Sequence, residues 1–478
     1  MKIALINFEE EAGYLPMAAP YLAGYLREKG YKDIKIIDGI DTIDQIKEYN
    51  PDIIGMGVYS STYYRANEFV KKVKCVTKSP IIAGGPHIYC MPEQIKNSNF
   101  DLGVVGEGEV TLYELVSLFE KRRKFELEDL RKIDGLVFVN EKGKLERTKP
   151  RALIENIDEI PMPAIDLLKL KEHYLIPGPA GASFLGVRGF LVTSRGCPYN
   201  CVFCASKSIW TKVRWHSAER TVAEIKKWVN QYGATHFYVY DDLFVANRLR
   251  LKKIIWLLKK EKLLGKVDFE ILCRANLVDE ELVGLLKELN VSTVPLGFET
   301  GSDKILNSLK GDTVTVAHGK RAIKLLYNAG IRVTGAFMVG NPYETEEDLQ
   351  KTFEMASDPR ISVLHVSYSI AFPGTKFWEY GVKNKIYPKD FWESGKFLTQ
   401  DVVDFNCLLS KEISKEKFTE YWNKFMKLNE EKIKKYNPKF EPKQIKLMMQ
   451  PRFLKKLWKK RKWLKLHIWY LMNNFKRN

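Results

Sequence analysis

The stretch "RGCPYNCVFCA", residues 195–205, places three cysteines within eight positions. They are Cys197, Cys201 and Cys204, in the spacing Cys-x3-Cys-x2-Cys, and they follow an apolar run at 188–193 that is typical of a β-strand. The other four cysteines are scattered along the chain: Cys75, Cys90, Cys273 and Cys407. A loop this rich in thiols, directly after a strand, indicates a metal or cluster site and no disulfide framework.

Three thiolates on one short loop can each bind one iron of a [4Fe-4S] cluster and leave the fourth iron open. A tetrahedral zinc site normally takes a fourth ligand, but the nearest histidine, His216, lies twelve residues beyond Cys204. There are two alternatives, a zinc site and three structurally unrelated thiols, and the spacing disfavours both. We therefore expect Cys197, Cys201 and Cys204 to ligate an iron–sulfur cluster.

The composition is that of a globular chain with two or three domains: 478 residues, 45% hydrophobic and 28% charged. The first apolar run, residues 3–7, is too short for the core of a signal peptide. No apolar stretch approaches the roughly 20 residues that cross a bilayer. Seven cysteines, an odd number without a regular pattern, favour a reducing compartment. The sequence therefore predicts a cytoplasmic protein.

Residues 1–145 alternate short apolar runs with amphipathic stretches, which predicts an α/β fold with a doubly wound, Rossmann-like sheet. The expected parallel strands are 3–7, 34–37, 52–58, 80–85 and 102–105, with helices at 20–30, 64–74 and 110–124 and a hairpin at 135–148. Residues 146–185 are rich in proline and glycine and are expected to be a linker.

A second strand–helix series occupies residues 186–395. Its expected strands are 188–193, 236–240, 267–272, 293–298, 332–338 and 363–370. Helical patterns follow the first five strands. Since eight such units close a full barrel, six predict a partial (β/α)6 barrel. Residues 396–478 are expected to form a helical, lysine-rich and tryptophan-rich C-terminal region.

The cysteine spacing, with the aromatic Phe203 directly before Cys204, resembles the signature of the radical S-adenosylmethionine (radical SAM) family. The resemblance implies that the open iron binds the amino and carboxylate groups of SAM. Reductive cleavage of SAM would then give methionine and a 5′-deoxyadenosyl radical. The resemblance also implies that Phe203 packs near the adenine and that an external donor such as flavodoxin or ferredoxin supplies the electron. The protein would orient SAM and the substrate and would exclude water from the pocket.

Further stretches resemble the radical SAM subfamily with an N-terminal cobalamin-binding domain, over roughly residues 1–380. Asp241 and Asp242 lie where one expected strand ends, Arg274 follows the next strand, and Glu299 lies in "LGFETGS". The carboxyl ends of barrel strands form the catalytic face. The resemblance therefore implies that these four residues contact SAM or the substrate. A helix cap is the alternative role for Asp242.

Within residues 1–145, Gly84, Gly85 and Gly106 let the backbone approach a flat ligand or simply make turns. Ser60 follows the third strand and either faces the corrin or shapes a turn. The signature Asp-x-His-x-x-Gly of classical cobalamin domains is absent, so that signature supplies no histidine for cobalt. His87 is expected to be a loop histidine bonded to backbone. The resemblance predicts cobalamin binding, and a domain that serves as scaffold without cobalamin is the alternative.

The net charge of +18 is unevenly spread, because residues 451–478 hold ten basic residues and no acidic one. Their apolar side chains share one helical face: Leu454, Leu457, Trp458, Leu464, Ile468, Leu471, Met472 and Phe475. A basic amphipathic helix rich in tryptophan favours peripheral contact with the inner face of the membrane. A helix docked on the protein is the alternative, and nucleic acid is the least favoured partner.

The sequence thus predicts a radical SAM enzyme that methylates an unactivated carbon of a small-molecule or lipid-like substrate with the help of cobalamin. The alternative is cobalamin-independent carbon–carbon bond formation, cyclisation or rearrangement. An RNA methylthiotransferase is less favoured, because such enzymes carry three further cluster cysteines where this chain has Cys75 and Cys90. A non-catalytic binding protein would not need the three clustered thiols. No catalytic residue and no substrate can be named from the sequence.

Overall fold

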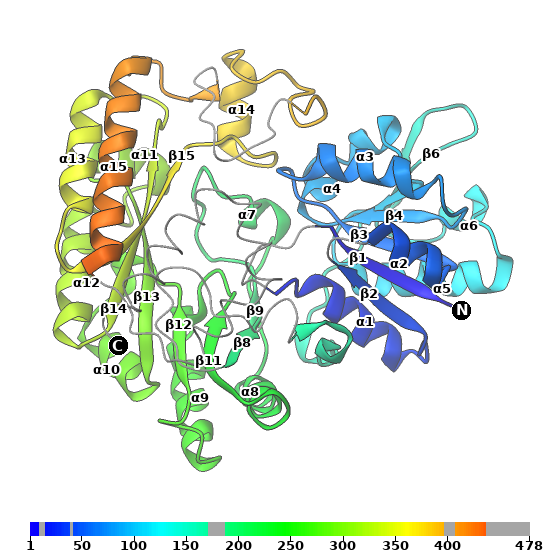
Figure 1. Ribbon diagram of the computed structural model, residues 1–478, viewed down its shortest axis with the longest axis horizontal. Helices are drawn as coiled ribbons and strands as arrows, with labels where there is room; N and C mark the ends of the chain where they lie inside the picture. Colours follow the sequence, from blue (N-terminus) through cyan, green and yellow to red (C-terminus); the bar gives the residue numbers. More distant parts are fainter. Residues whose placement is uncertain (9–14, 39–41, 171–186, 396–406, 436–478) are drawn as a thin grey trace, which may run out of the picture. The chain divides into compact units, whose positions relative to one another are not determined.

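The structure is a computed structural model that describes residues 1–8, 15–38, 42–170, 187–395 and 407–435. These residues form two compact parts, each built on its own sheet (Figure 1). The first part contains residues up to Leu170 together with Phe203–Arg214 and the described residues that follow Ala371 up to 395; the second contains the other described residues. The predicted tail at 451–478 lies outside the described residues, as does the glycine- and proline-rich stretch of the predicted linker.

The first part is a seven-stranded sheet in the order β2-β1-β3-β4-β5-β6-β7. The first five strands are parallel and the last two form an antiparallel hairpin. The strands are β1 (Ile3–Asn7), β2 (Ile34–Asp38), β3 (Ile53–Gly57), β4 (Ile81–Gly84), β5 (Leu102–Val104), β6 (Leu136–Val139) and β7 (Leu145–Arg147). The predicted doubly wound sheet is confirmed.

Helices surround this sheet, and the apolar strands are buried as a result. The helices are α1 (Ala18–Glu28), α2 (Thr42–Tyr49), α3 (Tyr63–Val73), α4 (Pro86–Cys90), α5 (Gly108–Arg122), α6 (Leu127–Leu130), α7 (Ser206–Ile209) and α14 (Lys376–Lys383), with 3-10 turns η1 (Pro92–Asn97), η2 (Ile157–Glu159) and η3 (Ile165–Leu167). Ile54, Val70 and Ile88 are completely buried in the core between α3, α4 and the strands.

Part of the predicted linker packs on α1. The amide of Ala164 donates to the carbonyl of Pro20 over 2.9 Å, and Arg27 donates to Asp166 over 2.9 Å. Gly24 lies so close to this segment that a Cβ there would come within 2.5 Å of the carbonyl oxygen of Met162. This stretch is therefore held by the first part, and the predicted domain boundaries stay predictions.

The second part is a six-stranded sheet in the order β15-β14-β13-β12-β11-β8, and every neighbouring pair is parallel. Its strands are β8 (Val187–Leu191), β11 (Ala234–Val239), β12 (Asp268–Ile271), β13 (Val291–Glu299), β14 (Arg332–Val339) and β15 (Ile361–Tyr368), and the two-residue strands β9 (Ser194–Arg195) and β10 (Arg214–Trp215) lie near the cysteines in the chain. The predicted partial barrel is confirmed. Parallel strands bring all six carboxyl ends to one edge, which is where such barrels place their sites.

Helices alternate with the strands of the second part. They are α8 (Ala218–Tyr232), α9 (Arg248–Lys260), α10 (Glu280–Glu288), α11 (Asp303–Lys310), α12 (Val316–Asn328), α13 (Glu346–Ala356) and α15 (Lys415–Lys435), with 3-10 turns η5 (Phe244–Ala246) and η6 (Ala275–Leu277). The side chains of Asn247, Asp279 and Thr345 cap the N-termini of α9, α10 and α13. The alternative of Asp242 as the cap of α9 is wrong, because Asn247 has that role.

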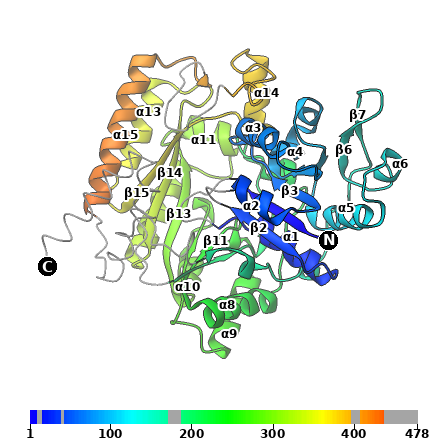
Figure 2. The ribbon, with the colours of Figure 1, turned by 45° about the vertical axis from the view of Figure 1, so that its right-hand side comes forward.

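Helix α15 covers the outer strand β15. The side-chain oxygen of Asn429 accepts a hydrogen bond from the amide of Leu364 over 2.8 Å, and the ammonium of Lys432 donates to the carbonyl of Ile361 over 3.0 Å. Figure 2 shows α15 in orange beside α13 and β15. This cover protects an edge strand that would otherwise expose unpaired backbone groups. Among the described residues, no helix is long and apolar enough to cross a membrane.

Candidate active site

The cysteine loop begins after β8. Cys197 and Cys201 are half-buried and belong to the second part, while Cys204 is exposed and belongs to the first. Burial raises the pKa of the Cys197 thiol, and the negative charge of Asp242 adds to the shift. No group of three or more His, Cys, Asp or Glu side chains surrounds a single ion position within the described residues. A [4Fe-4S] cluster does not require one, since each thiolate binds its own iron.

Arg274 is the residue that joins the end of β12 to the cysteine loop. Its Nη1 donates to Sγ of Cys201 over 3.2 Å, and its guanidinium lies over the ring of Tyr199, 4.0 Å from the centroid. Nη2 donates to the hydroxyl of Thr313 over 2.8 Å, and Nε to the side-chain oxygen of Asn276 over 3.0 Å. Arg274 and Cys201, which were predicted separately as site residues, are therefore in direct contact.

The C-terminal end of α11 supports the same loop. The last carbonyls of a helix have no partner inside the helix. Here the carbonyl of Leu309 accepts from the amide of Val202 over 3.0 Å, and that of Lys310 accepts from Arg274 Nη2 over 3.4 Å. Sequence reasoning did not identify this helix end as part of the site.

Glu299 ends β13 with a left-handed backbone, at a φ of 65°. The ammonium of Lys310 lies 2.8 Å from Glu299 Oε1 and donates to the carbonyl of Gly297 over 2.6 Å. Both charged side chains are almost completely buried. The Lys310 backbone and side chain therefore connect Arg274 to Glu299.

Asp241 and Asp242 have different surroundings. Asp241 is buried, and its two carboxylate oxygens accept from the amide and the hydroxyl of Thr193 over 2.5 and 2.6 Å. Burial raises the pKa of Asp241 even though these bonds act to lower it. Asp242 is exposed and lies within electrostatic range of Cys197. Of the two predicted carboxylates, only Asp242 is open to solvent.

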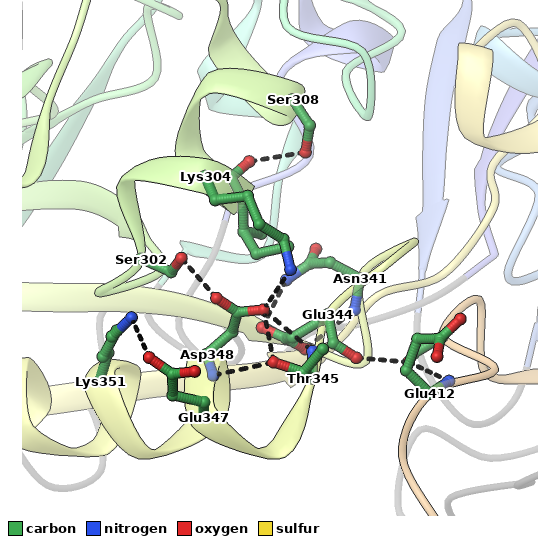
Figure 3. Close-up of polar contacts among 12 residues, drawn as sticks. Ser302, Lys304, Ser308, Asn341, Glu344, Thr345, Glu347, Asp348, Lys351 and Glu412 are labelled. Atoms are coloured by element: carbon green, nitrogen blue, oxygen red, sulfur yellow. Dashed lines mark hydrogen bonds and ion pairs between the residues drawn. The ribbon is translucent and has the colours of Figure 1, made fainter.

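The N-terminal starts of α11 and α13, which follow β13 and β14, are tied together (Figure 3). Asp348 accepts from the hydroxyl of Ser302 over 2.6 Å and from the ammonium of Lys304 over 2.9 Å. Burial disfavours the charge of Asp348, but these hydrogen bonds outweigh it and lower its pKa to about 2. In the same view Glu344 accepts from Asn341, and burial raises the pKa of Glu344 to about 7. Both carboxyls hold the loop after β14.

A cluster of charged and titratable side chains joins three neighbouring strands of the second part, β8, β11 and β12. His236 on β11 hydrogen-bonds Asp268 over 2.5 Å, and Arg188 on β8 pairs with Glu270 on β12 over 3.0 Å. Burial disfavours protonation of His236, but the hydrogen bonds to Asp268 and Glu270 outweigh it and raise its pKa. Neighbouring parallel strands place these residues side by side.

In the first part, Ser60 and His87 lie near the carboxyl ends of β3 and β4. His87 is completely buried: Nδ1 hydrogen-bonds the hydroxyl of Ser60 over 2.9 Å, and Nε2 the side-chain oxygen of Gln94 over 2.6 Å. The ring of Tyr63 lies 4.2 Å from that of His87. Burial lowers the pKa of His87 to about 4. The expectation of a loop histidine bonded to backbone is wrong, because His87 lies in α4 and its imidazole is bonded to two side chains. Neither nitrogen is left for cobalt.

Glycines occupy the carboxyl ends of β3 and β4 and follow β5, so no side chain projects from these positions. Gly57 ends β3 beside Gly84 of β4, and Gly106 follows β5. A Cβ at Gly57 or Gly106 would meet no atom within 4 Å, and one at Gly84 only Val104 at 4.0 Å. Gly85 has a different role, because its φ of 93° and the 3.0 Å approach of Val58 exclude a side chain. This edge, without side chains at three positions, can receive a flat ligand closely.

Phe203 packs within the first part. Its ring centroid lies 6.2 Å from that of the buried Phe377 on α14. After Cys204, the chain turns into α7, where the hydroxyl of Ser208 donates to the carbonyl of Gly374 over 2.5 Å. Phe203, within the cysteine loop, and Phe377 on α14 therefore form an aromatic pair, and sequence reasoning did not identify Phe377.

Comparison with known proteins identifies both parts. The chain matches the radical SAM superfamily over residues 191–356 and the B12 binding domain over residues 5–116. An uncharacterised methyltransferase of Pyrococcus horikoshii is 33% identical over 413 residues, which cover 84% of this chain and 85% of the relative. The chain is a radical SAM enzyme.

Two further relatives cover much of the chain. The anaerobic magnesium-protoporphyrin IX monomethyl ester cyclase of Rubrivivax gelatinosus is 29% identical over 427 residues, 85% of this chain and 74% of the relative. The solved structure of the radical SAM methyltransferase TsrM from Kitasatospora setae, with cobalamin and a [4Fe-4S] cluster, covers 90% of this chain and 89% of TsrM. Its TM-score is 0.67 at 17% sequence identity, which supports the fold.

Membership of the radical SAM superfamily implies a [4Fe-4S] cluster and SAM, and the B12 binding domain implies cobalamin. The residues fit both groups. Cys201 already accepts a hydrogen bond from a buried cation, as a cluster thiolate would. The strand ends of the first part are bare at Gly57, Gly84 and Gly106, as a flat macrocycle requires. A pocket of about 560 Å³ beside Asp52 and Ser79 lies near the amino ends of β3 and β4, away from this edge.

Proposed function

We propose that this radical SAM enzyme methylates an unactivated carbon in a cobalamin-dependent reaction. The observation that carries the proposal is the presence, in one chain, of a strand-end cysteine loop and of a B12-type sheet with bare strand ends. The name of the Pyrococcus horikoshii relative, a methyltransferase, supports the same reaction.

Cys197, Cys201 and Cys204 would hold the cluster, and Phe203 would pack near the adenine of SAM. We propose that Asp242 receives a polar group of SAM, since it is exposed beside Cys197. Asp241 would instead position the chain before the cysteines, because both its oxygens are bonded to Thr193.

Arg274 and Glu299 would be buried polar residues that line the SAM-binding site. Glu299 is held by Lys310, so its carboxylate has a fixed position before any ligand arrives. Preorganised charges of this kind need no reorganisation when SAM binds. When bound, the cluster would supply the electron that cleaves SAM, and cobalamin would supply the methyl group. Each methylation would then consume two SAM molecules and two electrons from an external donor such as flavodoxin or ferredoxin.

We propose that the first part binds cobalamin through the edge formed by Gly84, Gly85, Gly106 and Ser60, without a histidine on cobalt. The two hydrogen bonds of His87 support this proposal. The test is the electron paramagnetic resonance spectrum of cob(II)alamin in the full-length protein, which should lack splitting by an axial histidine nitrogen. Such splitting, lost in His87→Asn, would contradict it.

The central experiment is anaerobic purification from cobalamin-fed cells with quantification of iron, sulfide and cobalt. We expect about four irons and one cobalt per chain, and formation of both 5′-deoxyadenosine and S-adenosylhomocysteine. Cys201→Ala should lose iron and 5′-deoxyadenosine but retain cobalt. Cys75 lies in an exposed turn after α3, so Cys75→Ala is the matched control and should retain iron, 5′-deoxyadenosine formation and cobalt.

A second candidate is radical cyclisation or other carbon–carbon bond formation, with the first part as scaffold. The cyclase relative from Rubrivivax gelatinosus favours it. Two results would favour this candidate over methylation. The first is four irons per chain without cobalt after reconstitution with hydroxocobalamin. The second is formation of 5′-deoxyadenosine without S-adenosylhomocysteine.

We further propose a lipid-like substrate reached at the inner face of the membrane. The support is the basic, tryptophan-rich composition of residues 451–478, which lie outside the described residues. The full-length protein should bind anionic vesicles more tightly than a chain that ends at Gln450. Equal binding of the two would remove this support.

A further inference from the structure

Arg274 is a buried cation with neutral partners. Its side chain touches the thiol of Cys201, the amide oxygen of Asn276, the hydroxyl of Thr313, the backbone and the face of Tyr199. Arg274 is 6% exposed, and no ion pair with a carboxylate is present among the described residues. Other arginines of the second part, such as Arg188 and Arg248, are paired with Asp or Glu. The charge of Arg274 is therefore not compensated by a salt bridge.

The position of the guanidinium is fixed from several sides. Three of its nitrogens donate hydrogen bonds, and the ring of Tyr199, two residues before Cys201, lies against its face. The hydroxyl of Tyr199 also accepts from Asn276 over 3.3 Å. A guanidinium keeps its charge over the whole physiological pH range. The loop that would hold the cluster is thus built around a permanent positive charge.

We propose that Arg274 raises the reduction potential of the cluster held by Cys197, Cys201 and Cys204, through its hydrogen bond and charge at the Cys201 sulfur. The inference rests on the proposed cluster. Reduction adds one electron, so a cation beside a ligand sulfur stabilises the reduced form more than the oxidised form. Hydrogen bonds to cluster sulfurs act in the same direction. Arg274 is a positioning and tuning residue here, because it acts through Cys201.

The test is a redox titration of the reconstituted full-length protein without SAM, with dithionite as the one-electron reductant and the paramagnetic signal of the reduced cluster as readout. Arg274→Gln should lower the ratio of reduced to oxidised cluster at the wild-type midpoint at least tenfold, which equals a shift of about 59 mV for one electron. Arg274→Lys keeps the charge but loses the planar fork, so its shift should be smaller and of the same sign.

Arg248→Gln is the matched control. It removes one positive charge from the same barrel, but Arg248 is bonded to Asp279 and Glu281 and not to a cysteine. Its ratio of reduced to oxidised cluster at the wild-type midpoint should stay within threefold of the wild-type ratio. Equal midpoints in Arg274→Gln and the wild type, at equal iron and sulfide content, would overturn the inference. Should Arg274→Gln fail to retain iron, Arg274→Lys decides: a lower midpoint supports the inference and an unchanged one overturns it.

The failure of the proposed cluster is distinguishable from the failure of this inference. Without a cluster, the wild-type protein would show no iron, no sulfide and no paramagnetic signal. With a cluster that Arg274 does not tune, all three would be present and only the shift would be missing.

Discussion

Lys310 and Glu299 form an ion pair over 2.8 Å in which both side chains are almost completely buried. The pair links the end of α11 to the end of β13. Breaking such a pair from one side leaves an uncompensated charge in the interior, which costs about 3–5 kcal/mol. We therefore expect Lys310→Met to lower the free energy of unfolding of the second part by that amount, measured by denaturant titration of the apoprotein.

The double variant Lys310→Met/Glu299→Gln is the control for this prediction. It removes both charges and should recover much of the loss, because no unpaired charge remains. The exposed pair Lys226–Glu261 gives a comparison, since Lys226→Met should cost no more than about 1 kcal/mol. Equal costs at Lys310 and Lys226 would contradict the view that the Glu299 pair is buried in solution.

His87 predicts an acid sensitivity of the first part. Its pKa is about 4 in the folded chain against 6.5 for a free histidine, so only the unfolded chain binds this proton between those values. Stability should therefore fall as the pH falls from about 6.5 to 4, by up to about 3 kcal/mol. Denaturant titrations at several pH values should show this slope in the wild type and a flatter one in His87→Asn. An identical slope in both proteins would mean that other titratable groups, and not His87, cause the loss of stability at low pH.

Glu224 predicts the opposite trend in the second part. It lies buried on α8, and its Oε1 has no hydrogen-bond partner among the described residues. Burial raises its pKa from 4.5 to about 7, so the folded chain holds a proton that the unfolded chain releases. Stability should fall as the pH rises from about 4.5 to 7, by up to about 3 kcal/mol. Glu224→Gln should remove this dependence, with a gain over the wild type at pH 8 that is absent at pH 4.

The sequence was informative where a residue type or a hydrophobic pattern pointed clearly to one kind of structure or site. The short apolar runs at 3–7 and 102–105 predicted buried strands, and both are present as β1 and β5. The three cysteines within eight positions were visible without a structure for the same reason. Arg274 and Glu299 were predicted from the resemblance to the radical SAM subfamily, which agrees with the rule that parallel strands share one catalytic edge.

The partners of these residues could not be predicted, because they lie well outside the local sequence motifs that marked the site residues. Lys310 ends a helix with an ordinary amphipathic pattern, and Thr193 lies 48 positions before Asp241. Nothing local marks either as a partner of a buried carboxylate. Asp242 was a candidate helix cap because the helix start could not be placed to within a few residues, and the structure gives that role to Asn247.

Gly85 gives a last prediction, on the edge proposed to bind cobalamin. Its φ of 93° and ψ of −178° lie in a region that only glycine populates, and a Cβ would come within 3.0 Å of the backbone of Val58. Gly85→Ala should cost on the order of 1–3 kcal/mol and shift the turn that carries His87. Gly143, in an exposed hairpin turn at a φ of 68° with open space around it, is the matched control. Gly143→Ala should leave cobalt content unchanged, while Gly85→Ala should lower it in protein purified from cobalamin-fed cells. Wild-type cobalt content in a stably folded Gly85→Ala protein would mean that this turn does not shape the cobalamin site.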